Sequence, residues 1–116
     1  TQYAGVEALI GPQEQVDDVV REYERRRNVL VAGLNNIPGV TCRMPEGAFY
    51  AFPNVTAFGQ PSAWVADCVL EEAGVAVLPG DAFGDGGEGY LRLCFANSME
   101  NIELALERME RALRDL

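Results

Sequence analysis

The sequence contains no histidine and no lysine, so all nine of its basic residues are arginine. Without histidine, the chain cannot form a Ser-His-Asp triad or an imidazole metal site. Without lysine, it cannot form a Schiff base with a carbonyl compound, and it lacks the lysine of a phosphate-binding P-loop. Acid or base chemistry in this chain would therefore depend on carboxylates or tyrosines.

Cysteine is scarce as well, and the three residues present form no recognisable framework. Cys42, Cys68 and Cys94 are odd in number and widely spaced, which is not the pattern of zinc ligands or of disulfide pairs. They are typical of small reduced side chains in the core of a cytoplasmic protein. We therefore expect a cytoplasmic protein with no metal site.

Basic charge and long apolar runs are also lacking. Eighteen acidic residues stand against nine basic ones, so the chain has no basic surface of the kind that binds nucleic acid. No apolar run approaches the length of a membrane span, and no signal-peptide pattern opens the sequence. The remaining composition, 48% hydrophobic and 23% charged over 116 residues, is that of one globular domain with neither a nucleic-acid nor a membrane partner.

Helical spacing of the apolar residues predicts four helices. The first has no start signal, which suggests that the chain was cut from a longer protein. The second ends at Ile37-Pro38-Gly39, and Asn97 or Ser98 caps the last. The expected ranges are 1–10, 12–36, 62–73 with Gly74 just beyond its end, and 98 onwards.

Between the helices, shorter apolar runs predict strands. Residues 40–44 alternate apolar and polar side chains, and 48–52 are expected to pair with them in a hairpin across Pro45-Glu46-Gly47. Two further strands are expected at 75–78 and within 87–98. The resulting order, ααββαββα, predicts an α/β (α+β) two-layer sandwich, in which helices cover a small and mainly antiparallel sheet.

The strand within 87–98 carries an arginine in its middle. Leu91, Leu93 and Phe95 fall on one face and form a core stripe, whereas Arg92 lies on a semi-polar opposite face. Two interpretations are open. Arg92 is either a surface side chain whose charge reaches water, or a fixed guanidinium that binds a carboxylate through two parallel hydrogen bonds.

The glycine-rich stretch before this strand matches a nucleotide-binding pattern only formally. Gly84, Gly86 and Gly89 have G-x-G-x-x-G spacing, but a strand follows them where the pattern requires a helix. We interpret the stretch as a turn that tolerates positive φ. The aromatic cluster within 48–52 is more typical of a core than of a ligand site.

Three stretches carry a resemblance to a known family. They are P-E-G-A-F-Y-A-F-P over 45–53, E-E-A-G-V-A-V-L-P-G-D-A-F-G over 71–84, and G-Y-L-R-L-C-F-A-N-S-M-E-N-I over 89–102. In this order they resemble the carboxyl-terminal part of class I and II aminotransferases, the pyridoxal-phosphate enzymes of the aspartate aminotransferase kind. The resemblance extends over essentially the whole chain.

The resemblance implies a homodimeric enzyme that transfers an amino group between an amino acid and a 2-oxo acid. Its cofactor, pyridoxal 5′-phosphate, would be held through a lysine of a large upstream domain. Since this chain has no lysine, we expect it to bind no cofactor, to hold no catalytic residue and to be inactive by itself. Residues 12–116 would be the small domain. Residues 1–11 would be a remnant of a large-domain helix and linker, with apolar side chains that pack on the missing domain.

The resemblance also assigns two substrate-binding residues. Arg92 matches the arginine of the family's R-L-x-F-A motif, which binds the α-carboxylate of the substrate. Phe49, at the G-x-F position, is a secondary candidate. An alternative is a stand-alone regulatory module that binds an amino acid through Arg92 without chemistry. The sequence does not indicate which amino acid is recognised.

Overall fold

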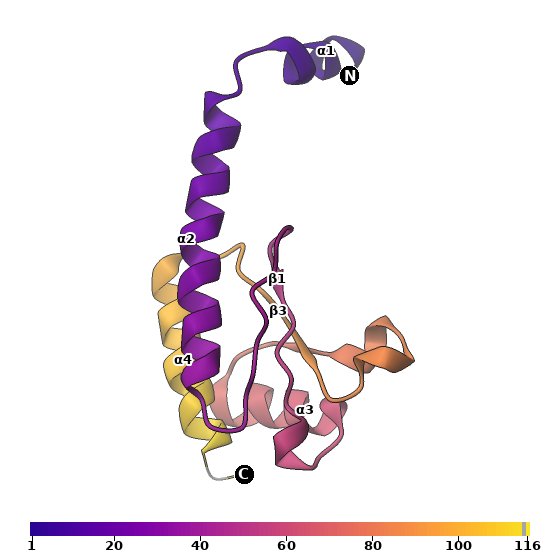
Figure 1. Ribbon diagram of the computed structural model, residues 1–116, viewed down its shortest axis with the longest axis vertical. Helices are drawn as coiled ribbons and strands as arrows, with labels where there is room; N and C mark the ends of the chain where they lie inside the picture. Colours follow the sequence, from indigo (N-terminus) through magenta and orange to yellow (C-terminus); the bar gives the residue numbers. More distant parts are fainter. Residues whose placement is uncertain (115) are drawn as a thin grey trace.

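The computed structural model describes residues 1–114 and 116 (Figure 1). This part of the chain forms four α-helices and three short strands, together with three short 3₁₀ turns. In chain order the elements are α1 (Gln2–Ile10), α2 (Glu14–Asn36), β1 (Tyr50–Ala51), η1 (Thr56–Phe58), α3 (Ser62–Ala73), β2 (Leu78–Pro79), η2 (Gly80–Phe83), η3 (Asp85–Gly87), β3 (Leu91–Cys94) and α4 (Met99–Leu113).

The sheet is small and antiparallel, with β3 between β1 and β2. Tyr50 of β1 pairs with Cys94 of β3, and Leu78 of β2 pairs with Arg92. The helices α2 and α4 lie side by side next to the sheet, and α3 packs against α4 and β2 (Figure 1). This arrangement confirms the predicted α+β class, in which helices cover a small antiparallel sheet.

The core fills the space between the sheet and these helices. The stripe predicted on β3 is confirmed, because Leu91, Leu93 and Phe95 are all buried. Burial of this face fixes the register of the strand and directs the intervening side chains to the opposite side. The helical partners in the core are Leu30, Val31 and Leu34 of α2, Val65, Ala66, Val69 and Ala73 of α3, and Ile102, Met109 and Leu113 of α4.

The helix ends agree with the sequence signals. Gly74 ends α3 in the left-handed conformation at φ 64°, where a side chain would be strained. The Ser98 hydroxyl oxygen accepts a hydrogen bond from the Asn101 backbone N–H, at 3.2 Å, and so caps α4. Ile37, with extended backbone, ends α2 as expected.

The strand predicted at 40–44 is wrong. This segment forms only a single bridge, in which Thr41 pairs with Asn54, and it does not form a hairpin with β1. The reason lies in Asn35 near the end of α2. Its amide oxygen accepts a hydrogen bond from the Cys42 N–H at 2.8 Å, and its amide nitrogen donates to the Cys42 carbonyl at 3.0 Å. The side chain thereby takes the place of a neighbouring strand.

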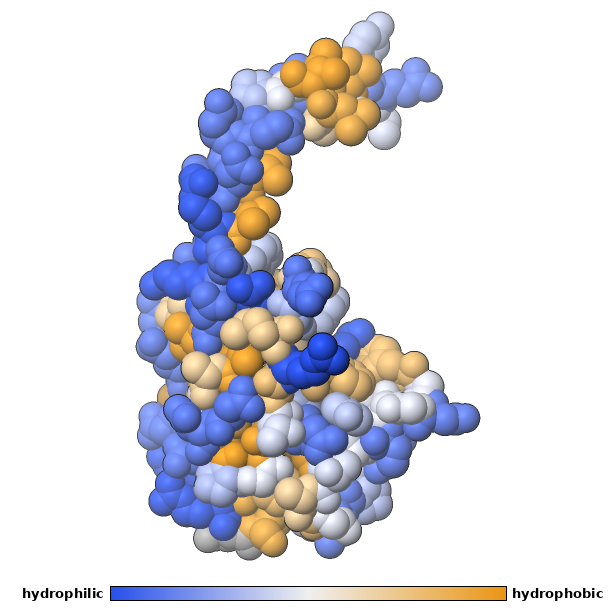
Figure 2. Space-filling view, viewed as in Figure 1, coloured by the Kyte–Doolittle hydropathy of each residue, from blue (hydrophilic) through white to orange (hydrophobic). Residues whose placement is uncertain are grey.

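The amino-terminal part of the chain extends away from this body (Figure 1). The radius of gyration is 16.5 Å, above the value of about 13 Å for a compact domain of this size. Figure 2 shows apolar surface on α1 and along the side of α2 that faces the hollow between α1 and the body. Among the described residues, no helix is both long and apolar enough to cross a membrane.

Candidate functional site

Arg92 lies at the centre of the sheet. It is the second residue of β3, the middle strand, and its backbone pairs with Leu78 of β2. Its neighbours Leu91 and Leu93 are buried on the core side. The side chain of Arg92, which is half-buried, therefore projects from the opposite face of the sheet. A paired central strand holds a side chain more precisely than a loop does, which suits a binding role.

Two aromatic rings contact the guanidinium of Arg92. Its central carbon lies 3.9 Å from the centroid of the Phe83 ring and 4.5 Å from that of the Tyr50 ring. Both distances are within the range of a cation–π interaction, in which the negative face of the ring attracts the cation. The guanidinium carbon lies over each of the two rings. The N–H donors of a guanidinium lie in its own plane.

No carboxylate of the described residues pairs with Arg92. The chain carries a formal net charge of −9, and ion pairs within 4 Å engage six of its arginines in the described part. All six lie on α2 or around the end of α4. Arg92 is thus a positively charged side chain on the central strand. Its N–H donors are not engaged by an acidic side chain of the described residues and can bind an anionic ligand. The electrostatics favour a carboxylate over a second cation or a neutral apolar group.

Phe49 lies one ring further from the guanidinium. Its ring centroid is 4.7 Å from that of Tyr50 and 5.9 Å from that of Tyr23. The preceding residue, Ala48, has a positive φ of 57°, and the Phe49 carbonyl accepts a hydrogen bond from the Phe95 N–H. The structure therefore places Phe49 in the same aromatic row as Arg92, with Tyr50 between them.

The two rings that contact Arg92 were not among the predicted site residues. In the sequence, Tyr50 falls in the aromatic cluster within 48–52, which is more typical of a core, and Phe83 falls in the P-G-D-A-F-G stretch. The sequence signal for them is weak, because the contacts depend on how β1 and β2 pair with β3. Only that register brings side chains from two distant segments onto one guanidinium.

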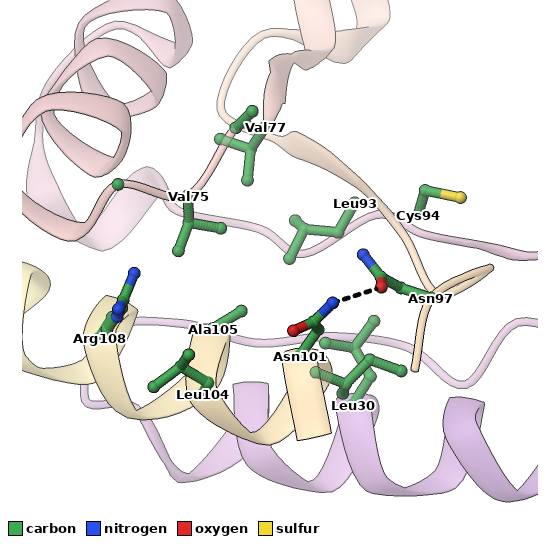
Figure 3. Close-up of a pocket in the computed structure, with 13 residues that line it drawn as sticks. Leu30, Val75, Val77, Leu93, Cys94, Asn97, Asn101, Leu104, Ala105 and Arg108 are labelled. Atoms are coloured by element: carbon green, nitrogen blue, oxygen red, sulfur yellow. Dashed lines mark hydrogen bonds between the residues drawn. The ribbon is translucent and has the colours of Figure 1, made fainter. Parts of the chain in front are cut away.

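A separate cavity of about 320 Å³ lies between α4, the segment 74–77 and the end of β3 (Figure 3). Asn97 and Asn101 lie on its wall, and the Asn101 amide donates to the Asn97 side-chain oxygen at 2.9 Å. Neither Arg92 nor Phe49 lines this cavity. It is therefore distinct from the candidate site.

The glycine-rich stretch forms a turn, as predicted. Gly84 and Gly89 have positive φ angles of 121° and 84°, and β3 follows directly. Between Gly84 and β3 the described chain forms only the 3₁₀ turn η3 and no α-helix, so the dinucleotide pattern's helix amino terminus is missing at this place. The formal dinucleotide pattern therefore has no structural counterpart here.

Comparison with known proteins identifies the family. The family described as "Aminotransferase class I and II" matches residues 1–109. An aspartate aminotransferase of Pyrococcus horikoshii is 43% identical over 114 residues, which cover 97% of this chain and 29% of that protein. An LL-diaminopimelate aminotransferase of Moorella thermoacetica is also 43% identical, over 97% of this chain and 28% of its own length.

The structure agrees with this match. The solved aromatic aminotransferase of Pyrococcus horikoshii superposes with a TM-score of 0.93 and 42% identity, over 98% of this chain and 31% of that one. The chain belongs to the class I and II aminotransferases. It spans less than a third of the length of these aminotransferase relatives.

The aminotransferase relatives differ in the substrates that their names state. Aspartate, LL-diaminopimelate and aromatic amino acids are named for three proteins of about equal identity to this chain. The names of these relatives therefore agree on the type of reaction and differ in the side chain of the substrate.

Proposed function

We propose that this chain is the substrate-binding small domain of an aminotransferase, and that Arg92 binds the α-carboxylate of the amino acid or 2-oxo acid. The observation that carries the proposal is the guanidinium of Arg92, which is mounted on the central strand and contacted by two rings. In the described residues it has no acidic partner. The family match supplies the class of reaction.

The chemistry of transamination gives this arginine a defined task. A guanidinium can donate two parallel hydrogen bonds to the two oxygens of a carboxylate. Two bonds fix the orientation of the amino acid as well as its position, so that the bond to be broken at Cα is aligned with the reacting groups. A neutral or flexible side chain at this position would bind the substrate with less precise alignment.

The residues of this chain do not fit covalent attachment of pyridoxal 5′-phosphate. The cofactor of such an enzyme is attached through an amine side chain, and the sequence has no lysine. We therefore place the cofactor site in a part of the enzyme outside these 116 residues. The tasks left to this chain are to bind and orient the substrate.

The same proposal covers the organisation of the whole enzyme. Residues 1–11 would belong to a helix and linker of the large domain, and 12–116 would form the small domain. The exposed apolar surface of α1 supports this division. We propose Phe49 as a secondary substrate contact, because its ring lies in the row that leads to Arg92. The enzyme would be a cytoplasmic homodimer.

The test is substitution of Arg92 in a chain that also carries the upstream residues of its relatives. Arg92→Ala removes charged hydrogen bonds worth about 1.5 to 3 kcal/mol each. We expect kcat/KM for the amino acid to fall about a hundredfold, which corresponds to roughly 3 kcal/mol. Arg92→Lys should lose nearly as much, because a lysine cannot reproduce the planar fork.

Two controls make this test specific. Activity on a simple amine, which lacks the carboxylate, should fall much less than activity on the amino acid. Arg108→Ala removes an arginine at the cavity of Figure 3 and should leave both activities unchanged. Retention of amino-acid activity within about threefold in both Arg92 variants would contradict the assignment. A carboxylate-binding module without chemistry would bind the amino acid but show no turnover.

A further inference from the structure

We propose that Phe83 and Tyr50 are positioning residues, whose rings clamp the guanidinium of Arg92 and set the plane in which it meets the carboxylate. This inference rests on the proposed function of Arg92. It assigns roles to two side chains that do not themselves need to touch the substrate.

The topology brings the two rings to Arg92 from segments at the two edges of β3. Tyr50 belongs to β1 and Phe83 to η2, which follows β2, and these strands flank β3 on its two edges. The ring centroids lie 4.5 Å and 3.9 Å from the central guanidinium carbon. Two rings in contact with the guanidinium restrict its rotation, and a ligand then approaches the N–H donors in the plane of the guanidinium.

Tyr50 is supported from behind. Its backbone pairs with Cys94 in the sheet, and the ring of Phe49 packs against its own ring at a centroid distance of 4.7 Å. The ring of Tyr23 in turn stacks on Phe49 at 5.9 Å. The row of rings leads back to α2, so the body of the domain limits the movement of Tyr50.

Phe83 is presented by a turn whose two ends are in contact. The Gly80 N–H donates to the Tyr90 carbonyl at 2.8 Å, which fixes the start of the turn beside β3. Gly87 packs so closely on Gly80 that a Cβ added there would lie 1.9 Å from the Gly80 carbonyl oxygen. Phe83 lies between these two glycines and is therefore carried by a closed loop.

The far end of the same turn is fastened to the start of α3. The Glu88 carboxylate accepts a hydrogen bond from the Ser62 N–H at 2.9 Å. The Ser62 hydroxyl oxygen accepts one from the Gly89 N–H at 2.6 Å, and Ser62 is fully buried. These bonds fix the segment that leads into β3 and Arg92. One framework thus positions Phe83 and the arginine together.

Two substitutions of Phe83 distinguish a positioning role from simple packing. Leucine at position 83 would keep an apolar side chain there but would remove the ring face. Tyrosine at the same position would keep that face. A cation–π contact at an exposed site predicts a two- to fivefold effect on binding from loss of one ring. The effect should be confined to substrates that carry a carboxylate.

The experiment measures Phe83→Leu, Phe83→Tyr and Tyr50→Leu in the holoenzyme of the longer chain, on an amino acid and on its decarboxylated amine. We expect both leucine variants to lower kcat/KM for the amino acid two- to fivefold relative to the amine. The variant Phe83→Tyr, which keeps the ring, should have the same ratio as the native sequence. Trp64→Leu, at a comparably exposed ring on α3, is the matched control and should leave the ratio unchanged. A structural effect would lower both activities equally and would overturn the proposal.

A spectroscopic measurement on the same variants is independent of turnover. A proton that lies over an aromatic ring is shifted upfield, so the Nε–H proton of Arg92 should move downfield in Phe83→Leu and Tyr50→Leu. An unchanged resonance would overturn the clamp. If Arg92→Ala itself left the preference for the carboxylate intact, the proposed function would fail. If Arg92→Ala abolished that preference while both leucine variants kept it, only the clamp would fail.

Discussion

The three cysteine thiols occupy three different environments. Cys42 is buried and Cys94 is exposed, with Cys68 between these extremes. Burial raises the pKa of the Cys42 thiol above its ordinary value near 9. Burial also raises the pKa of Cys68, with the negative charges of Glu72 and Glu71 acting in the same direction. The thiolate is the nucleophile. Burial therefore protects Cys42 in two ways, because it limits the access of reagents to the sulfur and keeps the thiol protonated.

We therefore expect iodoacetamide to modify Cys94 first and Cys42 last in the folded chain, with rates at least tenfold apart. Mass spectrometry of peptides at timed intervals measures this order. A Cys42 thiol that reacted as fast as Cys94 would contradict the burial of the Cys42 side chain. In denaturant the three rates should become similar, which provides the control.

The raised pKa of Cys42 also gives a sign for the pH dependence of stability. A folded-state pKa above the unfolded value near 9 means that the contribution of this thiol is complete below pH 9 and is lost as the pH rises further. The free energy of unfolding of the native sequence should therefore fall, relative to Cys42→Ala, between pH 8 and pH 10. Urea denaturation at the two pH values measures the difference. A constant difference would contradict the expectation.

At the scale of elements, helices and their ends could be predicted from the sequence, whereas the first strand could not. Helix ends depend on local signals such as Ser98 and Gly74, which act within a few residues. The segment 40–44 has the alternation of a strand, but Asn35 binds the backbone of Cys42. The spacing of apolar residues does not indicate that a side chain will take the place of a neighbouring strand.

The candidate site also has a part that the sequence predicts and a part that it does not. Alternation along β3 predicts that Arg92 lies opposite the core stripe, and its proposed carboxylate ligand comes from the family resemblance alone. The contacts of Phe83 and Tyr50 depend on the pairing of three strands and on the closed turn between Gly80 and Gly87. Such contacts between distant segments are fixed by tertiary structure, so residue spacing alone could not reveal them.

The closed turn can be tested with a matched pair of glycine substitutions. Gly87→Ala would place a Cβ 1.9 Å from a backbone oxygen of Gly80, and backbone cannot move aside as a side chain can. We expect a loss of about 1 to 3 kcal/mol in the free energy of unfolding. At neighbouring Gly86 an added Cβ meets nothing within 4 Å, so Gly86→Ala should change stability by no more than about 0.5 kcal/mol. Equal urea midpoints for the two variants would contradict the close contact.

At the scale of the whole molecule, the chain consists of a packed body and an extended arm. None of the residues Gln2–Ile10 of α1 is buried, and Tyr3, Leu9 and Ile10 are each more than 75% exposed. The buried residues of α2, Leu30, Val31 and Leu34, all lie in its second half. The arm thus presents apolar side chains that the body does not cover, which is typical of a surface that packs against another part of a protein.

This division predicts a gradient of backbone protection along the chain. A helix of nine residues without buried side chains is only marginally stable in water, so the amides of α1 should exchange rapidly in a monomeric sample of the 116 residues. The second half of α2 and the whole of α4 should exchange slowly, because their apolar faces form the core. Hydrogen exchange read out by mass spectrometry measures this directly. In a chain that carries the upstream residues, α1 should become protected while α4 stays as it was. Strong protection of α1 in a proven monomer of the short chain would contradict the assignment of residues 1–11 to the large domain.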